Sequence, residues 1–470
     1  MEKVQEQSGK FGKWIRTSIS ARMLMIGMLI LILLIPLSYV KSLIKERHYR
    51  QKEVVNEINQ KWGREVLLYG PILKVPYKTY TVKKIFNTAA QTQQEEVETN
   101  IKYAYFFPEQ LNIQTTINPE QKKRGIYKTA VYGSEIRING RFNTPDFSEV
   151  EVKEDDILWD KSKLIIETSN LKGVNKLVEI EFNNNTYAFA SQYGTTNTSS
   201  SIRKDHEYGV EHYPRLNLHK LESKFIKKAD VPIENPVTFS MKMHINGSKQ
   251  IRFIPVGKET DVNVVSNWKT ANFIGEFLPL NSDKITENGF DAKWKVLDIN
   301  RPFPQQSFDG IPNLKAYAFG VNFMIPVDEY QKSERSAKYG FLVIALTFLV
   351  FFLIQTMSKI PIHTFQYLMI GIALVMFYTL LISISEHSSY LKAYVIAGVS
   401  VVLLITLYSK SILKTVKFPL FIGISLAALY TFIFVIIQLE NYALLVGSIG
   451  LFVILAAVMY ASRKIDWNNG

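Results

Sequence analysis

Six apolar runs constrain this chain more than any other feature of its sequence. Each run is about 18 to 22 residues long, and a helix needs about 20 residues to cross a bilayer core of about 30 Å. Run length separates such helices from the buried helices of soluble proteins, which periodicity alone does not. The sequence therefore predicts six transmembrane helices, at residues 23–40, 338–357, 365–384, 390–408, 418–439 and 441–461.

The segment 41–337, between the first two runs, has a different character. It is polar and contains short stretches of alternating β-branched or aromatic residues, such as "YKTAVYGSEIRINGRF", with turn residues between them. Many short strands without helical patterns between them favour an antiparallel sandwich. We therefore predict a six-helix α-helical transmembrane bundle plus one large, mainly antiparallel, sandwich-like β domain outside the cytoplasm.

Local signals outline this β domain. Its first residues, "KSLIKERHYRQKEVVNEINQKWG", keep an apolar stripe and predict a stalk helix that ends at Gly63. Asn246-Gly247 predicts the type I′ turn of a hairpin, and Asn288-Gly289 predicts a second turn. The loop at 191–205 is a possible boundary between two β lobes.

The chain returns to the membrane through "PVDEYQKSERSAKYG", residues 326–340. Asp328 and Gln331 have the spacing of a capping box. Glu334 and Lys338 form an i, i+4 pair in the favourable order. We expect the second membrane helix to begin near Asp328, outside the bilayer.

Lysine and arginine predict the orientation of the bundle. They gather in the tail 1–22, at Lys359, at Lys410 to Lys417 and in the tail 462–470, whereas the loops "SEHSS" and "QLEN" contain none. Because basic connections stay in the cytoplasm, both termini are expected inside and the β domain outside. The first run ends without a small-residue cleavage site, so we expect it to remain as an anchor.

Composition narrows the classes of function. The net charge of +13 partly reflects the one-sided basic loops, so the bilayer rather than nucleic acid is the expected partner. The chain has no cysteine, which excludes disulfides and thiol nucleophiles. It has no phosphate-binding glycine motif, and His206, His212 and His219 lack helical metal-ligand spacing. We predict no catalytic residue, no metal and no cofactor.

Glu386 and His387 are the most conspicuous ionisable pair near the membrane. The predicted topology places them in the outer turn between the third and fourth helices, where charged groups are tolerated. An interfacial loop is the preferred interpretation, with a proton site or reactive pair as the alternative. The central parts of the predicted helices lack ionisable residues and carry small ones such as Gly371, Gly423 and Gly450, which favour close helix packing.

An aromatic stretch marks the β domain. Trp268, Phe273 and Phe277, in "SNWKTANFIGEFLP", together with Trp294 downstream, could line a ligand groove. Aromatic residues of this kind also form hydrophobic cores, and both interpretations stay open.

Several long motifs resemble the CreD family of bacterial inner-membrane proteins. They are "RGIYKTAVY", "SNWKTANFIGEFLP", "GFDAKWKVLDINRPFPQ", "FGVNFMIPVDEYQKSERSAKYGFLVIALTFLVFFL" and "HTFQYLMIGIALVMFYTLLISISEH", in this order along nearly the whole chain. The resemblance implies a protein of the inner membrane with a periplasmic domain and a role in cell-envelope integrity and stress. It implies no catalytic residues.

These observations favour a non-enzymatic protein that acts through its outer β domain, with an envelope component or another membrane protein as its partner. The alternatives are a transporter or channel and a membrane enzyme acting at the outer face of the bundle. A transporter would need a polar path through the helices. An enzyme would need reactive groups that converge at one depth, for which Glu386 and His387 are the candidates.

Overall fold

The structure is a computed structural model of the 470-residue chain. It describes residues 19–87, 92–192, 217–308, 310–323, 329–358, 360–413, 415–439 and 442–463. The chain divides into two compact units. The helical unit contains residues 1–53 and 327–470, and the β unit contains residues 54–326.

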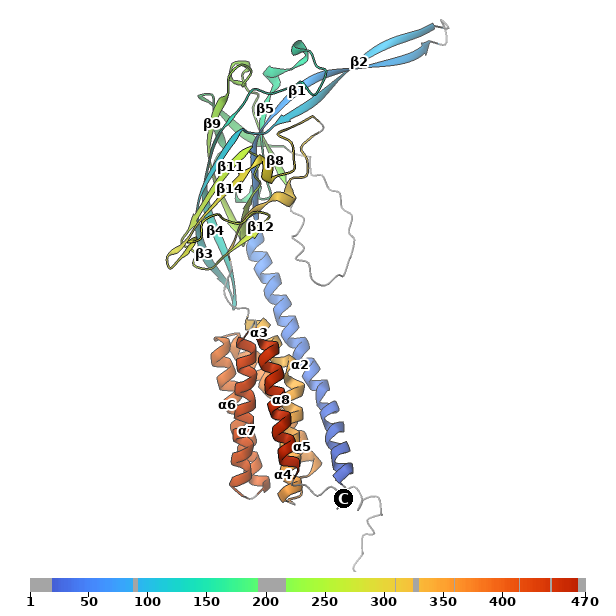
Figure 1. The fold of residues 1–470 in the computed structure, drawn as a ribbon, viewed down its shortest axis with the longest axis vertical. Helices are drawn as coiled ribbons and strands as arrows, with labels where there is room; N and C mark the ends of the chain where they lie inside the picture. The colour runs from blue at the N-terminus through green and yellow to red at the C-terminus, as the bar shows by residue number, and fades with distance from the viewer. Residues whose placement is uncertain are drawn as a thin grey trace, which may run out of the picture. The chain divides into compact units, whose positions relative to one another are not determined.

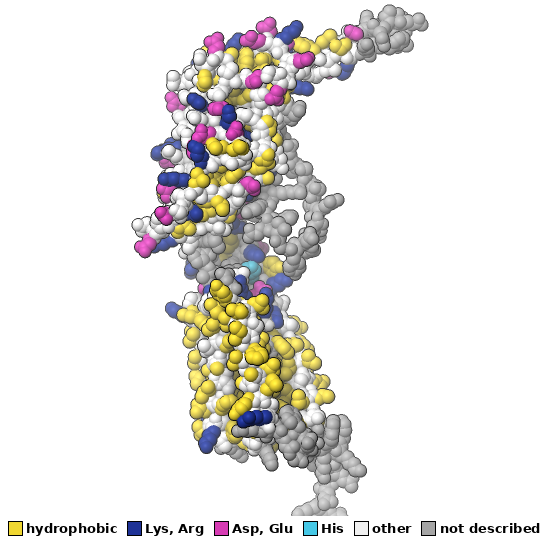
Figure 2. Space-filling model, viewed as in Figure 1, with side chains coloured by type: hydrophobic (Ala, Val, Ile, Leu, Met, Phe, Trp, Pro, Cys, Tyr) yellow, Lys and Arg dark blue, Asp and Glu magenta, His cyan; other side chains and the backbone are white. Residues whose placement is uncertain are grey.

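Within the described residues, six helices are long and apolar enough to cross a membrane, as predicted. Figure 2 shows hydrophobic side chains over much of the visible surface of the helical unit, as expected for helices that face lipid. In chain order, the helices are α2 (Ile19–Trp62), α3 (Glu329–Lys338), α4 (Gly340–Ser358), α5 (Thr364–Ser385), α6 (Tyr390–Leu413), α7 (Lys417–Gln438) and α8 (Ala443–Ser462).

The first membrane helix and the predicted stalk form one continuous helix, α2. Gly63 ends it with a φ of +123°, which favours glycine, and its N–H donates a hydrogen bond to the Asn59 carbonyl at 3.0 Å. The last turns of α2, from Val54 onward, belong to the compact β unit, whereas the earlier part of the helix belongs to the helical unit.

The second membrane crossing starts with the short helix α3, which is separated from α4 at Tyr339. The predicted i, i+4 pair is present, with Lys338 Nζ 3.8 Å from a carboxylate oxygen of Glu334. Asp328, the first residue of the predicted capping box, lies outside the described residues.

Small residues let the membrane helices approach one another closely. A Cβ atom on Gly371 of α5 would collide with Leu33 of α2, and one on Gly450 of α8 would collide with the ring of Phe432 of α7. A Cβ on Gly423 of α7 would lie 2.7 Å from the hydroxyl oxygen of Thr406. Glycine at these positions therefore permits the packing of the bundle.

In the described residues, the β unit is built on one 16-stranded sheet, in which 14 strands follow one continuous pairing path and β2 and β15 branch from it at β1. Most strand pairs are antiparallel, whereas β1 with β10 and β3 with β11 are parallel. The strands are β1 (Val66–Asn87), β2 (Thr92–Phe106), β3 (Gln110–Arg124), β4 (Tyr127–Phe142), β5 (Lys163–Thr168), β6 (Glu179–Phe182), β7 (Asn185–Ser191), β8 (His219–Ser223), β9 (Val237–Ser248), β10 (Gln250–Phe253), β11 (Glu259–Ser266), β12 (Ala271–Gly275), β13 (Ile285–Thr286), β14 (Gly289–Leu297), β15 (Gln306–Ser307) and β16 (Phe319–Phe323).

The two halves of this path face each other across one hydrophobic core. Trp294 of β14 and Phe319 of β16 lie far apart in the pairing order, yet their ring centroids are 5.5 Å apart. Tyr132 of β4 and Phe323 of β16 make a similar contact at 5.0 Å. The sheet therefore folds over itself in a sandwich-like manner, as predicted. Figure 1 shows β1 and β2 extending as a long hairpin beyond the other strands.

The prediction of a hairpin turn at Asn246-Gly247 is wrong. Both residues lie inside β9 and pair with β4, with Gly247 opposite Tyr132. The chain turns at Lys249, whose φ is +62°, and β10 then pairs with β1 and β16 instead of folding back on β9. Long pairing with β4 outweighs the local preference of an Asn-Gly pair for a turn.

A second turn is present, but one residue earlier than predicted. Glu287 and Asn288 join β13 to β14, and Gly289, with a φ of +140°, already pairs with Thr286. Asn288 does not have the positive φ that a type I′ turn at Asn288-Gly289 requires. Of the possible lobe boundary at 191–205, only the first two residues are described. The described parts of 54–326 form one compact unit.

Candidate functional site

A polar pocket of about 340 Å³ opens in the β unit. Its polar side chains come from the strands β1, β2, β5 and β8 and from the segments before β8 and β16. They are Tyr69 of β1, Glu167 of β5, Lys220 of β8, and Asn313 and Lys315, with Asn217 and Tyr105 also in the lining. A concave pocket with a few convergent polar groups is the usual form of a ligand site.

Strand register brings the central side chains of this pocket together. Tyr69 of β1 is opposite Glu167 of β5, and Glu167 is opposite Lys220 of β8. Directly opposite residues point to the same face of a sheet, so the three form a row across three neighbouring strands. The Tyr69 hydroxyl donates a 2.6 Å hydrogen bond to Glu167, whose other oxygen is 4.0 Å from Lys220 Nζ.

The environment fixes the protonation state of Tyr69. Burial and the neighbouring Glu167 carboxylate raise the pKa of the Tyr69 hydroxyl, because both disfavour a phenolate. Tyr69 therefore stays a neutral donor at physiological pH. The carboxylate of Glu167 and the ammonium of Lys220 are both partly exposed, so a bound molecule could contact both charges.

A second polar row lies beside the pocket and is more deeply buried. The Glu222 side chain, only 3% exposed, accepts hydrogen bonds from Lys74 at 3.2 Å, Lys163 at 3.0 Å and Gln192 at 2.6 Å. Burial raises the pKa of Glu222, but its hydrogen bonds and the charges of the two lysines outweigh this and lower the pKa below its ordinary value. Lys74 also lies over the Tyr103 ring at 4.1 Å.

These two rows were not recognised from sequence. The charged residues of "KLIIET" are four positions apart and those of "HKLES" are two apart, so within each strand they lie on one face. The sequence does not show that the two faces are adjacent. Tyr69 and Glu167 are 98 residues apart, and only the sheet register brings them into contact.

The predicted aromatic residues lie elsewhere in the β unit. Trp294 is 2% exposed, and its indole N–H donates a 3.0 Å hydrogen bond to the Phe277 carbonyl. The Phe273 ring lies 5.9 Å from that of Trp294, and Phe277 lies 5.6 Å from Phe319. Trp268 packs against the same core and is partly buried. These contacts have the form of core packing, and the ligand groove stays a prediction.

Glu386 and His387 occupy the predicted turn between α5 and α6, but their side chains have different surroundings. Glu386 accepts a 3.2 Å hydrogen bond from the Tyr330 hydroxyl of α3, and its carboxylate is 3.7 Å from Nε of Arg47 of α2. The Glu386 side chain is 15% exposed. His387 is exposed. The two residues therefore need not act as a pair.

Further contacts join α3 to the start of α6. A carboxylate oxygen of Glu329 accepts a 2.8 Å hydrogen bond from the Tyr390 backbone N–H, which caps α6. The Ser336 and Tyr390 hydroxyls are 2.6 Å apart in a buried position. The polar groups at this end of the helical unit thus fasten α2 and α3 to the α5–α6 turn.

Comparison with known proteins agrees with the candidate membrane-spanning helices of the described residues. Residues 18–468 match the family described as Inner membrane protein CreD. The chain is 27% identical over 444 residues to the Inner membrane protein CreD of Escherichia coli (strain K12). That alignment covers 93% of this chain and 91% of the other protein.

Proposed function

Because the chain belongs to the CreD family of inner membrane proteins, we propose that it supports the cell envelope as a non-enzymatic protein whose β domain binds an envelope component. The observation that carries this proposal is the pocket at Tyr69, Glu167 and Lys220. It offers a carboxylate, ammonium groups and side-chain amides within one concavity. Such a set binds polar molecules that carry hydroxyl, amine or carboxyl groups.

In this proposal the β domain lies in the periplasm and both termini lie in the cytoplasm. The basic residues of the helix connections support this orientation, because Lys410, Lys417 and Arg463 stand at connections or ends on one side of the bundle. The pocket would then be open to molecules of the envelope, and the membrane helices would anchor it to the inner membrane.

The alternative of a transporter, channel or membrane enzyme would use the polar contacts around Glu386. Most of the polar groups around Glu386 are used in contacts that join one helix to another. Glu386 contacts α2 and α3, and Glu329 caps α6. This supports an anchoring role for the cluster and favours the binding function of the β domain.

In-cell photocrosslinking tests the proposal. A photoreactive residue would replace Asn313, an exposed pocket residue, and a control would replace Lys83, an exposed residue of the β1–β2 hairpin. We expect an adduct at 313 that Glu167→Gln reduces and that does not form at 83. An adduct that is insensitive to Glu167→Gln, or equal labelling at both positions, would contradict binding in this pocket.

A further inference from the structure

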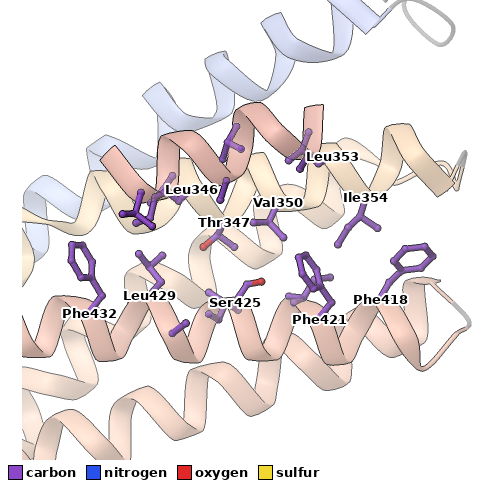
Figure 3. Close-up of a pocket in the computed structure, with 18 of the residues that line it drawn as sticks. Leu346, Thr347, Val350, Leu353, Ile354, Phe418, Phe421, Ser425, Leu429 and Phe432 are labelled. Atoms are coloured by element: carbon purple, nitrogen blue, oxygen red, sulfur yellow. The ribbon is translucent and has the colours of Figure 1, made fainter. Parts of the chain in front are cut away.

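A second pocket, of about 910 Å³, lies in the helical unit between α4, α7 and α8. Figure 3 shows Leu346, Val350 and Ile354 of α4 facing Phe421, Leu429 and Phe432 of α7 across it. On the α8 side the lining includes small residues, Gly450, Ala457 and Ala461. No residue of α8 is buried, and the described residues leave the pocket beside this helix unfilled.

The lining of this pocket selects for an apolar occupant. Rings and aliphatic side chains make up most of it, and the hydroxyl of Thr347 already donates a 2.7 Å hydrogen bond to the Val343 carbonyl of its own helix. Several lining residues, including Phe421, Val453 and Ala457, are exposed. The pocket is therefore open to the surface of helices that cross the membrane, where lipid chains are the surrounding solvent.

The pocket is elongated along α8. From Gly450 to Ala461 the lining of that helix spans about 17 Å at 1.5 Å per residue. Acyl chains, which run along membrane helices, suit a groove of this direction and length.

A positive charge marks one end of the pocket. Lys417, the first residue of α7, belongs to the lining and is exposed. At the same end the lining includes Ala461 of α8, and Arg463 follows two residues later. Lysine side chains at helix ends extend to the interface and attract anionic headgroups. A molecule with apolar chains and a phosphate at one end matches both the lining and this charge.

From these features we propose that the pocket between α4, α7 and α8 binds an anionic glycerophospholipid from the surrounding membrane. Its acyl chains lie between Phe421, Val350 and Ala457, and its phosphate pairs with Lys417. The bound lipid fills the space beside α8 and holds that helix against α4 and α7. This site is separate from the polar pocket of the β domain and does not depend on what that pocket binds.

Native mass spectrometry of the full-length protein in mild detergent tests this proposal. Phosphatidylglycerol and the zwitterionic phosphatidylethanolamine are the two probes. We expect tighter binding of phosphatidylglycerol to the unchanged protein. Lys417→Ala should reduce that affinity about fivefold, the factor for one basic residue near an anionic lipid surface, and should leave phosphatidylethanolamine binding unchanged.

Two control variants and one variant that fills the pocket make the test more specific. Lys410→Ala removes an exposed basic residue from the last turn of α6, outside the pocket lining, and should have no effect. Ala457→Phe fills the pocket and should weaken binding of both lipids, whereas Leu444→Phe, at an exposed position of α8 outside the lining, should not.

Three results would overturn the proposal. The first is equal affinity for the two lipids in the unchanged protein, and the second is an equal effect of Lys417→Ala and Lys410→Ala. The third is a dimer that Ala457→Phe abolishes, because a second copy would then occupy the pocket. If Ala457→Phe does not fold, the comparison of Lys417→Ala with Lys410→Ala decides the question alone.

Discussion

The Tyr330 hydroxyl lies 3.2 Å from Oε1 of Glu386 and donates a hydrogen bond to it. Tyr330 belongs to α3, which follows the β unit in the chain, and Glu386 ends α5. The same carboxylate approaches Arg47 of α2, the helix that leads into the β unit. The Glu386 side chain therefore contacts both α2, through which the chain leaves the helical unit, and α3, through which it returns.

This relationship predicts unequal effects for the two residues of the turn. Tyr330→Phe should lower the unfolding free energy by about 0.5–1.5 kcal/mol, the usual contribution of one hydrogen bond. Glu386→Gln keeps an acceptor oxygen but removes the negative charge that strengthens the bond, so its loss should fall in the lower part of the same range. The half-exposed Arg47 adds little. His387→Asn should change it by less than about 0.5 kcal/mol, because His387 is exposed. Thermal unfolding of the full-length protein in detergent measures all three.

The double variant makes this test specific. Tyr330 and Glu386 share one interaction, so their combined effect should be smaller than the sum of the single effects. Additive effects, or a His387→Asn effect as large as that of Glu386→Gln, would show that the contact does not stabilise the turn.

Gly247 provides a test of packing in the sheet. A Cβ atom there would lie 2.5 Å from Cζ of Tyr132, which is fully buried and donates a 2.8 Å hydrogen bond to the Gln250 carbonyl. Gly247→Ala should therefore cost about 1–3 kcal/mol through overpacking. Gly133→Ala, on the paired strand, is the matched control because its Cβ would meet only Asn246 Oδ1, at 3.4 Å. Equal losses of stability would contradict this account.

Glu222 gives the β unit a predictable response to pH. Its pKa in the folded protein is lower than the ordinary 4.5, so its stabilising effect is complete above about pH 4.5 and is lost as the pH falls through the folded value. Glu222→Gln should lower stability at pH 7 by about 1–3 kcal/mol. The difference between the two proteins should shrink below pH 4.5.

Tryptophan fluorescence can follow this unfolding in the full-length protein, because Trp159 and Trp294 are buried in the β unit. A difference that stays constant between pH 7 and acid conditions would mean that the charge of Glu222 does not contribute. Lys83→Gln, which removes an exposed ion pair with Glu98, serves as the control and should show little effect at either pH.

The proposed orientation predicts which engineered thiols a membrane-impermeant reagent can reach. The natural chain has no cysteine, so each single substitution gives a clean signal. Lys83→Cys in the β unit should react in intact spheroplasts, whereas Lys410→Cys at the end of α6 should react only after the membrane is permeabilised. The reverse pattern would place the β domain in the cytoplasm.

The sequence predicted the six membrane helices because run length depends on the chain alone and the bilayer sets the required length. It predicted the stalk of α2 from an equally local signal, and it placed the turn between β13 and β14 to within one residue. It failed at Asn246-Gly247, where twelve residues of β9 pair with β4 and override the turn preference. It also missed the pocket, because the register among β1, β5 and β8 joins residues distant in the chain.

Complementation with pocket variants tests the central claim most directly. Glu167→Gln with Lys220→Gln would be expressed in a strain that lacks the protein and has an envelope-stress phenotype, beside a surface control, Lys83→Gln with Glu98→Gln. Membrane abundance would be measured in parallel. The account predicts normal abundance for both proteins, with complementation lost only in the pocket variant. Full complementation by the pocket variant at normal abundance would contradict a function that depends on this pocket.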